Sequence, residues 1–293
     1  MMATEHTDAL EPLDMWIDVG GRHLHYVTAG SGATPVVLLH GGIIDAATLS
    51  WGGSIAPFAD DQRVIALDLP GYGSSSRPDA EYTTAYHTEV LGDFLDALNL
   101  SSISLVGVSM GGGIALRYAL HNQSRVKSLV LVDSHGLGRQ LPNGYLTYVL
   151  SRLPKLNELS ISLLKRNRRL AKLALSGIVH DPDTLSRSVV DEFYRLLQRP
   201  DAGRAYRRWR ACEVERGGFR TDFSDRLEDL EVPTLLVHGT EDPIFPVRWS
   251  RRAADRIPEA SLEIRPECGH WPQREQTTAF NERAMEFLVR YGQ

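Results

Sequence analysis

One pentapeptide, Gly107-Val108-Ser109-Met110-Gly111, has the composition of a nucleophile elbow. The apolar run 103–106 precedes it and the helix-like stretch 112–119 follows it, so a strand would lead into a helix through a tight turn. Such a turn exposes the serine hydroxyl, and its flanking glycines are needed because a Cβ there would strike neighbouring backbone. The pattern predicts Ser109 as a nucleophile. The alternative is a glycine-rich turn that carries a serine by chance.

Two further candidate groups lie in loops near the C-terminal end of the chain. Asp242 follows the apolar run 234–237, and His270 follows the run 261–265. A histidine that removes the serine proton and a carboxylate that orients the histidine complete a Ser-His-Asp constellation. We therefore predict His270 as the general base and Asp242 as the acid. Asp133, which also ends an apolar run, is the alternative acid.

The loop 40–45, His-Gly-Gly-Ile-Ile-Asp, follows the first of the continuous apolar runs. Attack of a serine on a carbonyl creates an oxyanion, which backbone N–H groups can stabilise. We predict one donor at Met110, directly after the nucleophile, and the second at Gly42, with Ile43 as the fallback. His40 is interpreted as a residue that braces the loop.

Residues beside these groups form the predicted substrate pocket: Trp271, Ile43 and Val108. The histidines and the two cysteines show no metal-ligand spacing, so the prediction includes neither a metal nor an organic cofactor.

The elements that must position these groups are short apolar runs of the kind found in strands covered on both faces. Helical periodicity separates several of them, as in 86–98, which predicts an α/β fold with a doubly wound, mostly parallel sheet. The alternating segment 14–28 predicts an antiparallel hairpin at the sheet edge. Ligands of such sheets bind beyond the carboxyl ends of the strands. The runs are 35–39, 63–67, 103–108, 126–132 and 234–237.

Residues 136–221 break the alternation with several helical patterns and no convincing strand. We predict a helical lid inserted after the sixth strand, between core segments 1–135 and 222–293. The insertion holds 17 Lys and Arg against 8 Asp and Glu, so its net charge is +9 and that of the rest of the chain is −14.

This charge has three interpretations: attraction of an anionic substrate, attraction of a lipid surface, or solvated faces of amphipathic helices. The third is favoured, and it expects the leucines of the insertion to face inward. These are Leu163, Leu164, Leu170 and Leu173.

Bulk composition narrows the remaining possibilities. The chain has 293 residues, 42% of them hydrophobic, and a net charge of −5, which is typical of a globular protein without a basic nucleic-acid-binding domain. No apolar run is long enough for a transmembrane segment, and the N-terminus shows no signal or transit peptide pattern. With only two cysteines, the expected location is the cytoplasm. The sequence makes no prediction about oligomeric state.

Together, the elbow, the 40–42 loop, Asp242 and the Gly269-His270 pair resemble the α/β-hydrolase family from about Asp14 to Leu288. The resemblance implies the family's fold. Because members that cleave carbon–halogen bonds or epoxides use aspartate as the nucleophile, a serine argues against those activities.

The segment 268–275 is similar to the histidine loop of the meta-cleavage-product hydrolases, which split carbon–carbon bonds in dienoic ring-fission acids. Those enzymes usually carry asparagine where this chain has Val108, and Gly-Pro-Gly where it has the residues 43–45. The expected function is therefore hydrolysis of a small carboxylic ester or lactone through an acyl-enzyme. Carbon–carbon hydrolysis is the alternative, and a small-molecule receptor on a hydrolase scaffold is a third hypothesis. The expected partner is a small molecule, either anionic or an apolar acyl compound.

Overall fold

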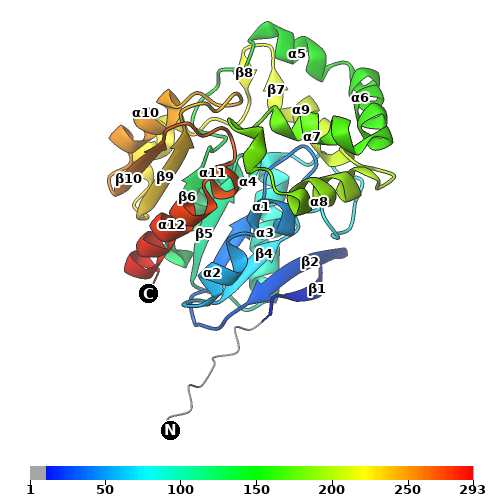
Figure 1. Ribbon diagram of the computed structural model, residues 1–293. Helices are drawn as coiled ribbons and strands as arrows, with labels where there is room; N and C mark the ends of the chain where they lie inside the picture. The colour runs from blue at the N-terminus through cyan, green and yellow to red at the C-terminus, as the bar shows by residue number, and fades with distance from the viewer. Residues whose placement is uncertain (1–10, 293) are drawn as a thin grey trace.

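The computed structural model describes residues 11–292 and contains an eight-stranded sheet within them (Figure 1). Residues 1–10, which belong to the segment without a signal peptide pattern, lie outside the described part. The strand order is β1-β2-β4-β3-β5-β6-β9-β10. The strands are β1 (Leu13–Val19), β2 (Arg22–Ala29), β3 (Val36–Leu39), β4 (Val64–Leu67), β5 (Ile103–Val108), β6 (Val126–Val132), β9 (Thr234–Gly239) and β10 (Ala260–Arg265).

The predicted sheet architecture is confirmed. Strands β3 to β6, β9 and β10 run parallel, while β1 and β2 form the antiparallel hairpin at one edge. The register pairs Leu39 with Gly107 and Val132 with Val237. Because these pairs lie at or near the carboxyl ends of their strands, the loops that follow meet at one edge of the sheet.

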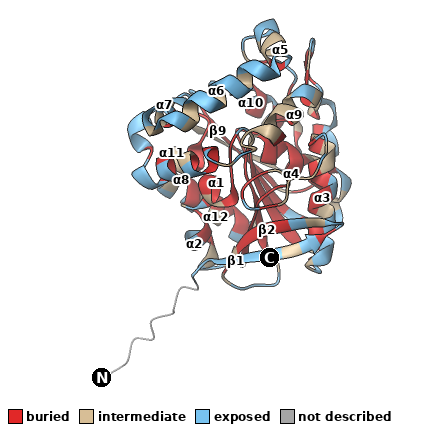
Figure 2. Cartoon of the chain, turned by 90° about the vertical axis from the view of Figure 1, so that its right-hand side faces the viewer, coloured by how far each residue is buried: buried red, intermediate tan, exposed pale blue. Residues whose placement is uncertain are grey.

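Helices cover both faces of the sheet, because alternate strand residues point to opposite sides. Val37 and Leu39 belong to one core cluster and Val36 and Leu38 to the other. Figure 2 shows the buried sheet between these layers. The first cluster includes residues of α3 (Thr84–Ala97), α4 (Met110–His121) and α10 (Arg248–Arg256). The second includes residues of α1 (Ala47–Trp51), α2 (Ile55–Ala59) and α12 (Thr277–Tyr291).

Residues 136–221 lie between β6 and β9 in the chain and form the upper part of the molecule in Figure 1. The segment contains α5 (Tyr145–Ser151), α6 (Pro154–Arg166), α7 (Arg168–Ser176), α8 (Arg187–Leu197) and α9 (Arg204–Glu213). It also contains a two-stranded hairpin, β7 (Val214–Glu215) and β8 (Gly218–Phe219), so the expectation of no strand was wrong. Strands of two residues are too short to show an apolar period. The remaining helices are η1 (Gln123–Arg125), η2 (Pro182–Thr184), η3 (Ser224–Asp229) and α11 (Pro272–Glu275).

The expectation that the leucines of this segment face inward holds for only one of the four. Leu164 lines the cavity described below. Leu163, Leu170 and Leu173 are 43%, 40% and 70% exposed, so this part of the prediction was wrong. An apolar pattern shows that a helix has an apolar face, but it does not show whether another element covers that face.

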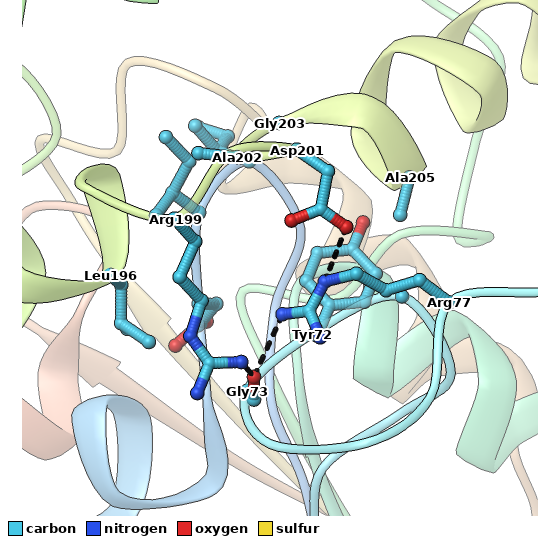
Figure 3. A pocket seen from close by; sticks show the side chains of 13 residues that line it. Tyr72, Gly73, Arg77, Leu196, Arg199, Asp201, Ala202, Gly203 and Ala205 are labelled. Carbon is cyan, nitrogen blue, oxygen red and sulfur yellow. Dashed lines mark hydrogen bonds and ion pairs between the residues drawn. The ribbon is translucent and has the colours of Figure 1, made fainter.

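A small pocket marks the junction between the 136–221 segment and the core (Figure 3). The Arg77 Nε lies 2.6 Å from Asp201 Oδ2, and its Nη2 donates to the Gly73 carbonyl oxygen at 2.9 Å. Arg199 donates to the same carbonyl oxygen. Two guanidinium groups, one from each side, therefore hold the segment to the loop after β4. No helix within residues 11–292 is long and apolar enough to cross a membrane.

Candidate active site

Ser109 sits at the junction of β5 and α4 with φ 54° and ψ −119°. A non-glycine residue with positive φ is strained, so this backbone must be held by its surroundings. The Ser109 N–H donates to the Val132 carbonyl at 2.9 Å. A Cβ at Gly107 would lie 2.4 Å from the Gly111 oxygen, and one at Gly111 would lie 2.4 Å from the His40 oxygen. Both flanking positions therefore admit only glycine, as an elbow requires.

Asp242 and His270 are joined directly. Asp242 Oδ2 lies 2.9 Å from His270 Nδ1, and its Oδ1 accepts from the N–H groups of Ile244 and Phe245 at 2.7 and 3.2 Å. Burial opposes ionisation of Asp242, but the charge of His270 and the hydrogen bond to it outweigh burial and lower the carboxyl pKa. An ionised Asp242 fixes the proton on Nδ1, which leaves Nε2 to accept a proton.

Ser109 and His270 line the same cavity. Within residues 11–292, no hydrogen bond joins the Ser109 hydroxyl to the His270 ring, whose side-chain hydrogen bond is with Asp242. The structure thus brings the predicted acid and the predicted base together, and it places Ser109 on the wall of the cavity that His270 also lines. In unliganded enzymes such catalytic contacts are often long and tighten when a substrate binds.

The histidine loop is held by a residue that the sequence analysis missed. Glu275 accepts from the Gly269 N–H through Oε1 at 2.9 Å and from the His180 N–H through Oε2 at 2.7 Å. The His270 N–H donates to the Ile178 carbonyl at 2.7 Å. The 136–221 segment therefore positions the loop that carries the base. The only sequence signal was an acid five residues after His270, and this acid is the last residue of the short helix α11.

Asp133 does not hydrogen-bond His270. It is fully buried, its Oδ1 accepts from the Gly239 N–H at 3.1 Å, and the same oxygen lies 3.3 Å from His238 Nε2. Burial, and then the charge of Asp242, raise the pKa of Asp133 well above its usual range, so the group is a neutral acid beside an ionised one. The contact to the base favours Asp242 as the acid over Asp133.

His238 lies between the two carboxyl groups and was also missed. Its Nδ1 accepts from the Ser250 hydroxyl at 2.7 Å, and its Nε2–H donates to the Phe245 carbonyl at 3.1 Å. Burial lowers the pKa of this ring, which keeps it neutral. Its Nε2 also lies 3.5 Å from Asp242 Oδ2. The His238 ring thus braces the loop that carries Asp242. The sequence signal for this role was a histidine near the end of β9, four residues before Asp242.

Asp133, Asp242 and His270 place one potential metal-ligand atom each within 4.8 Å of one another. The Asp242 and His270 atoms already bond each other at 2.9 Å, and Asp133 favours its protonated form. A bound cation would have to break the contact between Asp242 and His270, and it would have to ionise Asp133. The arrangement therefore fits a proton relay better than a metal site.

The 40–45 loop is braced by its own side chains. Asp45 Oδ2 accepts from the Gly41 N–H at 2.8 Å and from the Ser50 hydroxyl at 2.7 Å. His40 Nε2 accepts from the Leu69 N–H at 3.0 Å, which confirms its bracing role. Since the Gly41 N–H is engaged, the assignment of the second oxyanion donor to Gly42 remains the simplest prediction. The position of Met110 in the structure also favours its N–H as the first oxyanion donor.

Met110 is the first residue of α4, so its N–H has no partner within the helix. Ile43, the fallback donor, has φ 61°, which is rare for a β-branched residue. The strain at Ile43 and at Ser109 falls on two loops that line the same cavity. Backbone strain of this kind often accompanies a functional site.

The cavity has a volume of about 430 Å³. Of the three predicted pocket residues, Trp271 and Ile43 line it. Val108 does not: its side chain is fully buried in the second core cluster, so this prediction was wrong. Because side chains alternate along a strand, the last residue of β5 points into the sheet's packing layer while Ser109 leaves it.

Most of the cavity wall comes from the 136–221 segment and is apolar, with residues such as Ile161, Leu164 and Leu175. One part of the wall is cationic. Arg207 and Arg210 of α9 both line the cavity. Arg207 Nη2 lies 3.5 Å from Glu158, while the Arg210 guanidinium lies 5.8 Å from the Tyr206 ring centre. An acyl compound with an apolar body and an anionic group would match this wall.

Comparison with known proteins identifies hydrolases at the level of both the family and its individual members. The sequence model of the alpha/beta hydrolase fold family matches residues 34–277. The chain is 30% identical over 283 residues to 2-hydroxy-6-oxo-6-(2'-aminophenyl)hexa-2,4-dienoic acid hydrolase of Metapseudomonas resinovorans, covering 95% of this chain and 91% of that protein. It is 31% identical over 258 residues to 2-hydroxymuconate semialdehyde hydrolase of a Pseudomonas species, covering 87% of each.

Solved structures agree with these relatives. A serine hydrolase involved in carbazole degradation is similar with a TM-score of 0.79 and 27% identity, covering 95% of this chain and 99% of that one. A meta-cleavage product hydrolase from Pseudomonas fluorescens has a TM-score of 0.79 and 25% identity, covering 94% and 97%.

Proposed function

Because the chain belongs to the α/β-hydrolase family, we propose that it is a serine hydrolase that cleaves a small carboxylic ester or lactone. The observation that carries the proposal is the strained Ser109 at a strand–helix junction, on the wall of a cavity that His270 also lines. The buried Asp242 holds the other nitrogen of that ring.

In the proposed mechanism, His270 Nε2 takes the proton of the Ser109 hydroxyl, and the serine oxygen attacks the carbonyl carbon. Asp242 stabilises the imidazolium that forms. The N–H groups of Met110 and Gly42 stabilise the oxyanion. As the carbon–oxygen bond of the ester breaks, the imidazolium protonates the leaving alkoxide oxygen, which departs as the alcohol. His270 then takes a proton from the water that attacks the acyl-enzyme, and the released Ser109 oxygen is protonated again.

In this proposal, residues 136–221 act as a lid. They provide most of the apolar wall and bind the histidine loop through Ile178 and His180. The apolar wall would hold the acyl chain and exclude water from the reacting carbonyl.

An active-site-directed phosphonate tests the nucleophile. We expect it to add covalently to Ser109, and Ser109→Ala to lose both labelling and hydrolysis, by at least about 10⁴-fold in kcat. Ser160→Ala is the matched control, since Ser160 lines the same cavity away from the elbow, and it should still be labelled. Full activity of Ser109→Ala would show that the elbow is not catalytic.

Carbon–carbon bond hydrolysis of a dienoic ring-fission acid is the second candidate. The two relatives named above are hydrolases of a dienoic acid and of a related semialdehyde, and the cationic wall at Arg207 and Arg210 suits an anion. The residues 43–45 line the cavity and differ from the Gly-Pro-Gly that those enzymes usually carry, which argues for the ester. We would compare kcat/KM for aryl esters of graded acyl length, a lactone and a dienoic ring-fission acid. The substrate with the highest kcat/KM decides between the candidates, and a single slow turnover on all of them would favour the receptor hypothesis.

A further inference from the structure

The helices α6 and α7 carry apolar residues both where they line the cavity and where they face solvent. Ile161 and Leu164 of α6 and Leu175 of α7 line the cavity. The same helices also carry an outer leucine face, defined as Leu156, Leu159, Leu163, Leu170 and Leu173, whose exposures range from 40% to 70%. No residue of α6 is buried, and Figure 2 shows its exposed outer surface. A surface helix normally turns polar residues to solvent, so an uncovered apolar face indicates an interaction surface.

The outer leucine face follows from helical spacing. Leu156, Leu159 and Leu163 are separated by three and four residues, as are neighbours on one side of a helix. On α7, Leu170 and Leu173 repeat this spacing, and α6 and α7 pack against each other. The five leucines therefore form one exposed patch across both helices, and none of them lines the cavity.

Cations border this patch. Residues 145–176 contain seven Lys and Arg and one Asp or Glu, whereas the whole chain has a net charge of −5. The single acid, Glu158, is paired with Arg207 of α9. Within residues 11–292, only Arg168 of these seven cations pairs with an acidic side chain. Arg152 and Lys165 donate to backbone carbonyls. The other four form neither kind of contact: Lys155, Arg166, Arg169 and Lys172. Arg166 follows Leu163 by three residues and Lys155 precedes Leu159 by four, so each lies beside a leucine of the patch.

We propose that the outer leucine face docks on a lipid bilayer that contains anionic phospholipid. Leucines flanked by Lys and Arg are the composition of helices that lie in a membrane interface. The anionic headgroups would neutralise the bordering cations, and the leucines would enter the acyl boundary. The acidic remainder of the chain would be repelled by the same surface, so the protein would bind in one orientation, with the roof of its cavity toward the lipid.

Charge also argues against a second copy of this chain as the occupant. In a symmetric dimer the same patch occurs on both partners. Each copy would bring its excess of cations to the contact, and the like charges would oppose the burial of the leucines. A bilayer with anionic headgroups supplies both an apolar phase and the opposite charge.

Vesicle flotation tests the proposal. The full chain is mixed with vesicles of phosphatidylcholine alone, or with one part in three of phosphatidylglycerol, at low and high salt. We expect flotation only with the anionic vesicles, and less of it at high salt. Equal binding to both vesicle types, or no binding to either, overturns the proposal. Concentration-dependent dimerisation that is lost when the patch is mutated would identify a second copy as the occupant and also overturn it.

Two double variants test whether the outer leucine face makes the contact. The variant with Leu159→Asp and Leu173→Asp should have a vesicle partition coefficient at least about tenfold lower than the parent chain. The variant with Lys155→Gln and Arg166→Gln should have one about 25-fold lower at low salt. Leu262→Asp with Lys127→Gln, an exposed pair on β10 and β6, is the control and should bind like the parent chain. Undiminished binding of both patch variants would refute the assignment.

Hydrolysis of a water-soluble ester by these variants serves as the folding control, since none of the substituted residues lines the cavity. Ser109→Ala should lose hydrolysis and keep vesicle binding. Docking and catalysis can therefore fail independently.

Discussion

Asp133 and Asp242 follow neighbouring parallel strands, β6 and β9, and their carboxyl groups lie within 4.8 Å of each other and of His270. Only Asp242 bonds the base, at 2.9 Å. Two buried carboxyl groups this close do not both ionise readily, so their pKa values separate: that of Asp242 is lowered and that of Asp133 is raised. The pair therefore has one charged member, which contacts the predicted base, and one neutral member, which contacts Gly239 and His238.

The first prediction assigns the acid. Asp242→Asn should lower kcat by about 10³- to 10⁴-fold, because the amide cannot stabilise the imidazolium. Asp133→Asn should cost less than about tenfold, because an amide resembles the neutral carboxyl that Asp133 presents. Steady-state kinetics on one activated ester measures both values. A larger loss at Asp133 would reverse the assignment.

The second prediction concerns stability at high pH. Burial raises the pKa of Asp133, so the native state keeps a proton that the unfolded chain releases above about pH 4. The unfolded state then binds fewer protons, and this contribution to stability is complete below about pH 4 and is lost as pH rises through the native pKa. Asp133→Asn has no such proton to lose. Its Tm relative to the parent chain should therefore rise as pH increases from about pH 4 toward the native pKa of Asp133, as thermal unfolding would show. A constant difference in Tm would mean that Asp133 is already ionised in the native state.

The third prediction concerns the cationic wall of the cavity. Arg210→Gln and Arg207→Gln should each raise KM for an anionic substrate about 10- to 100-fold, the loss expected for a charge-assisted hydrogen bond. KM for a neutral ester of similar size should change little. Arg208→Gln is the matched control, because Arg208 lies on the same helix but pairs with Asp79 and does not line the cavity. Equal effects on neutral and anionic substrates would argue against a charge-selective wall.

The fourth prediction concerns the junction in Figure 3. The Arg77–Asp201 ion pair joins the core to the 136–221 segment. Asp201→Asn should speed limited proteolysis within that segment about fivefold, since removing about 1 kcal/mol increases local opening by that factor. Asp191→Asn is the control, because Asp191 pairs with Arg168 and Arg187 inside the segment. If both variants are cleaved at the same rate, the ion pair does not restrain the junction.

The sequence by itself determined the parts of this protein that depend on local pattern. Continuous apolar runs indicated buried parallel strands. Gly107 and Gly111 around Ser109 indicated an elbow, and a Cβ at either glycine would indeed lie only 2.4 Å from a backbone oxygen. Position along the chain was enough to propose Asp242 and His270, since the ends of parallel strands meet at one edge of the sheet.

Only the tertiary structure decided the rest. It separated Asp242 from Asp133, because the choice depends on which carboxyl group reaches His270, and it showed Glu275 holding the histidine loop. It removed Val108 from the cavity and placed Leu163, Leu170 and Leu173 on the outside. A residue's apolar character is local, but the element that covers it, if any, is set by contacts between segments far apart in the chain.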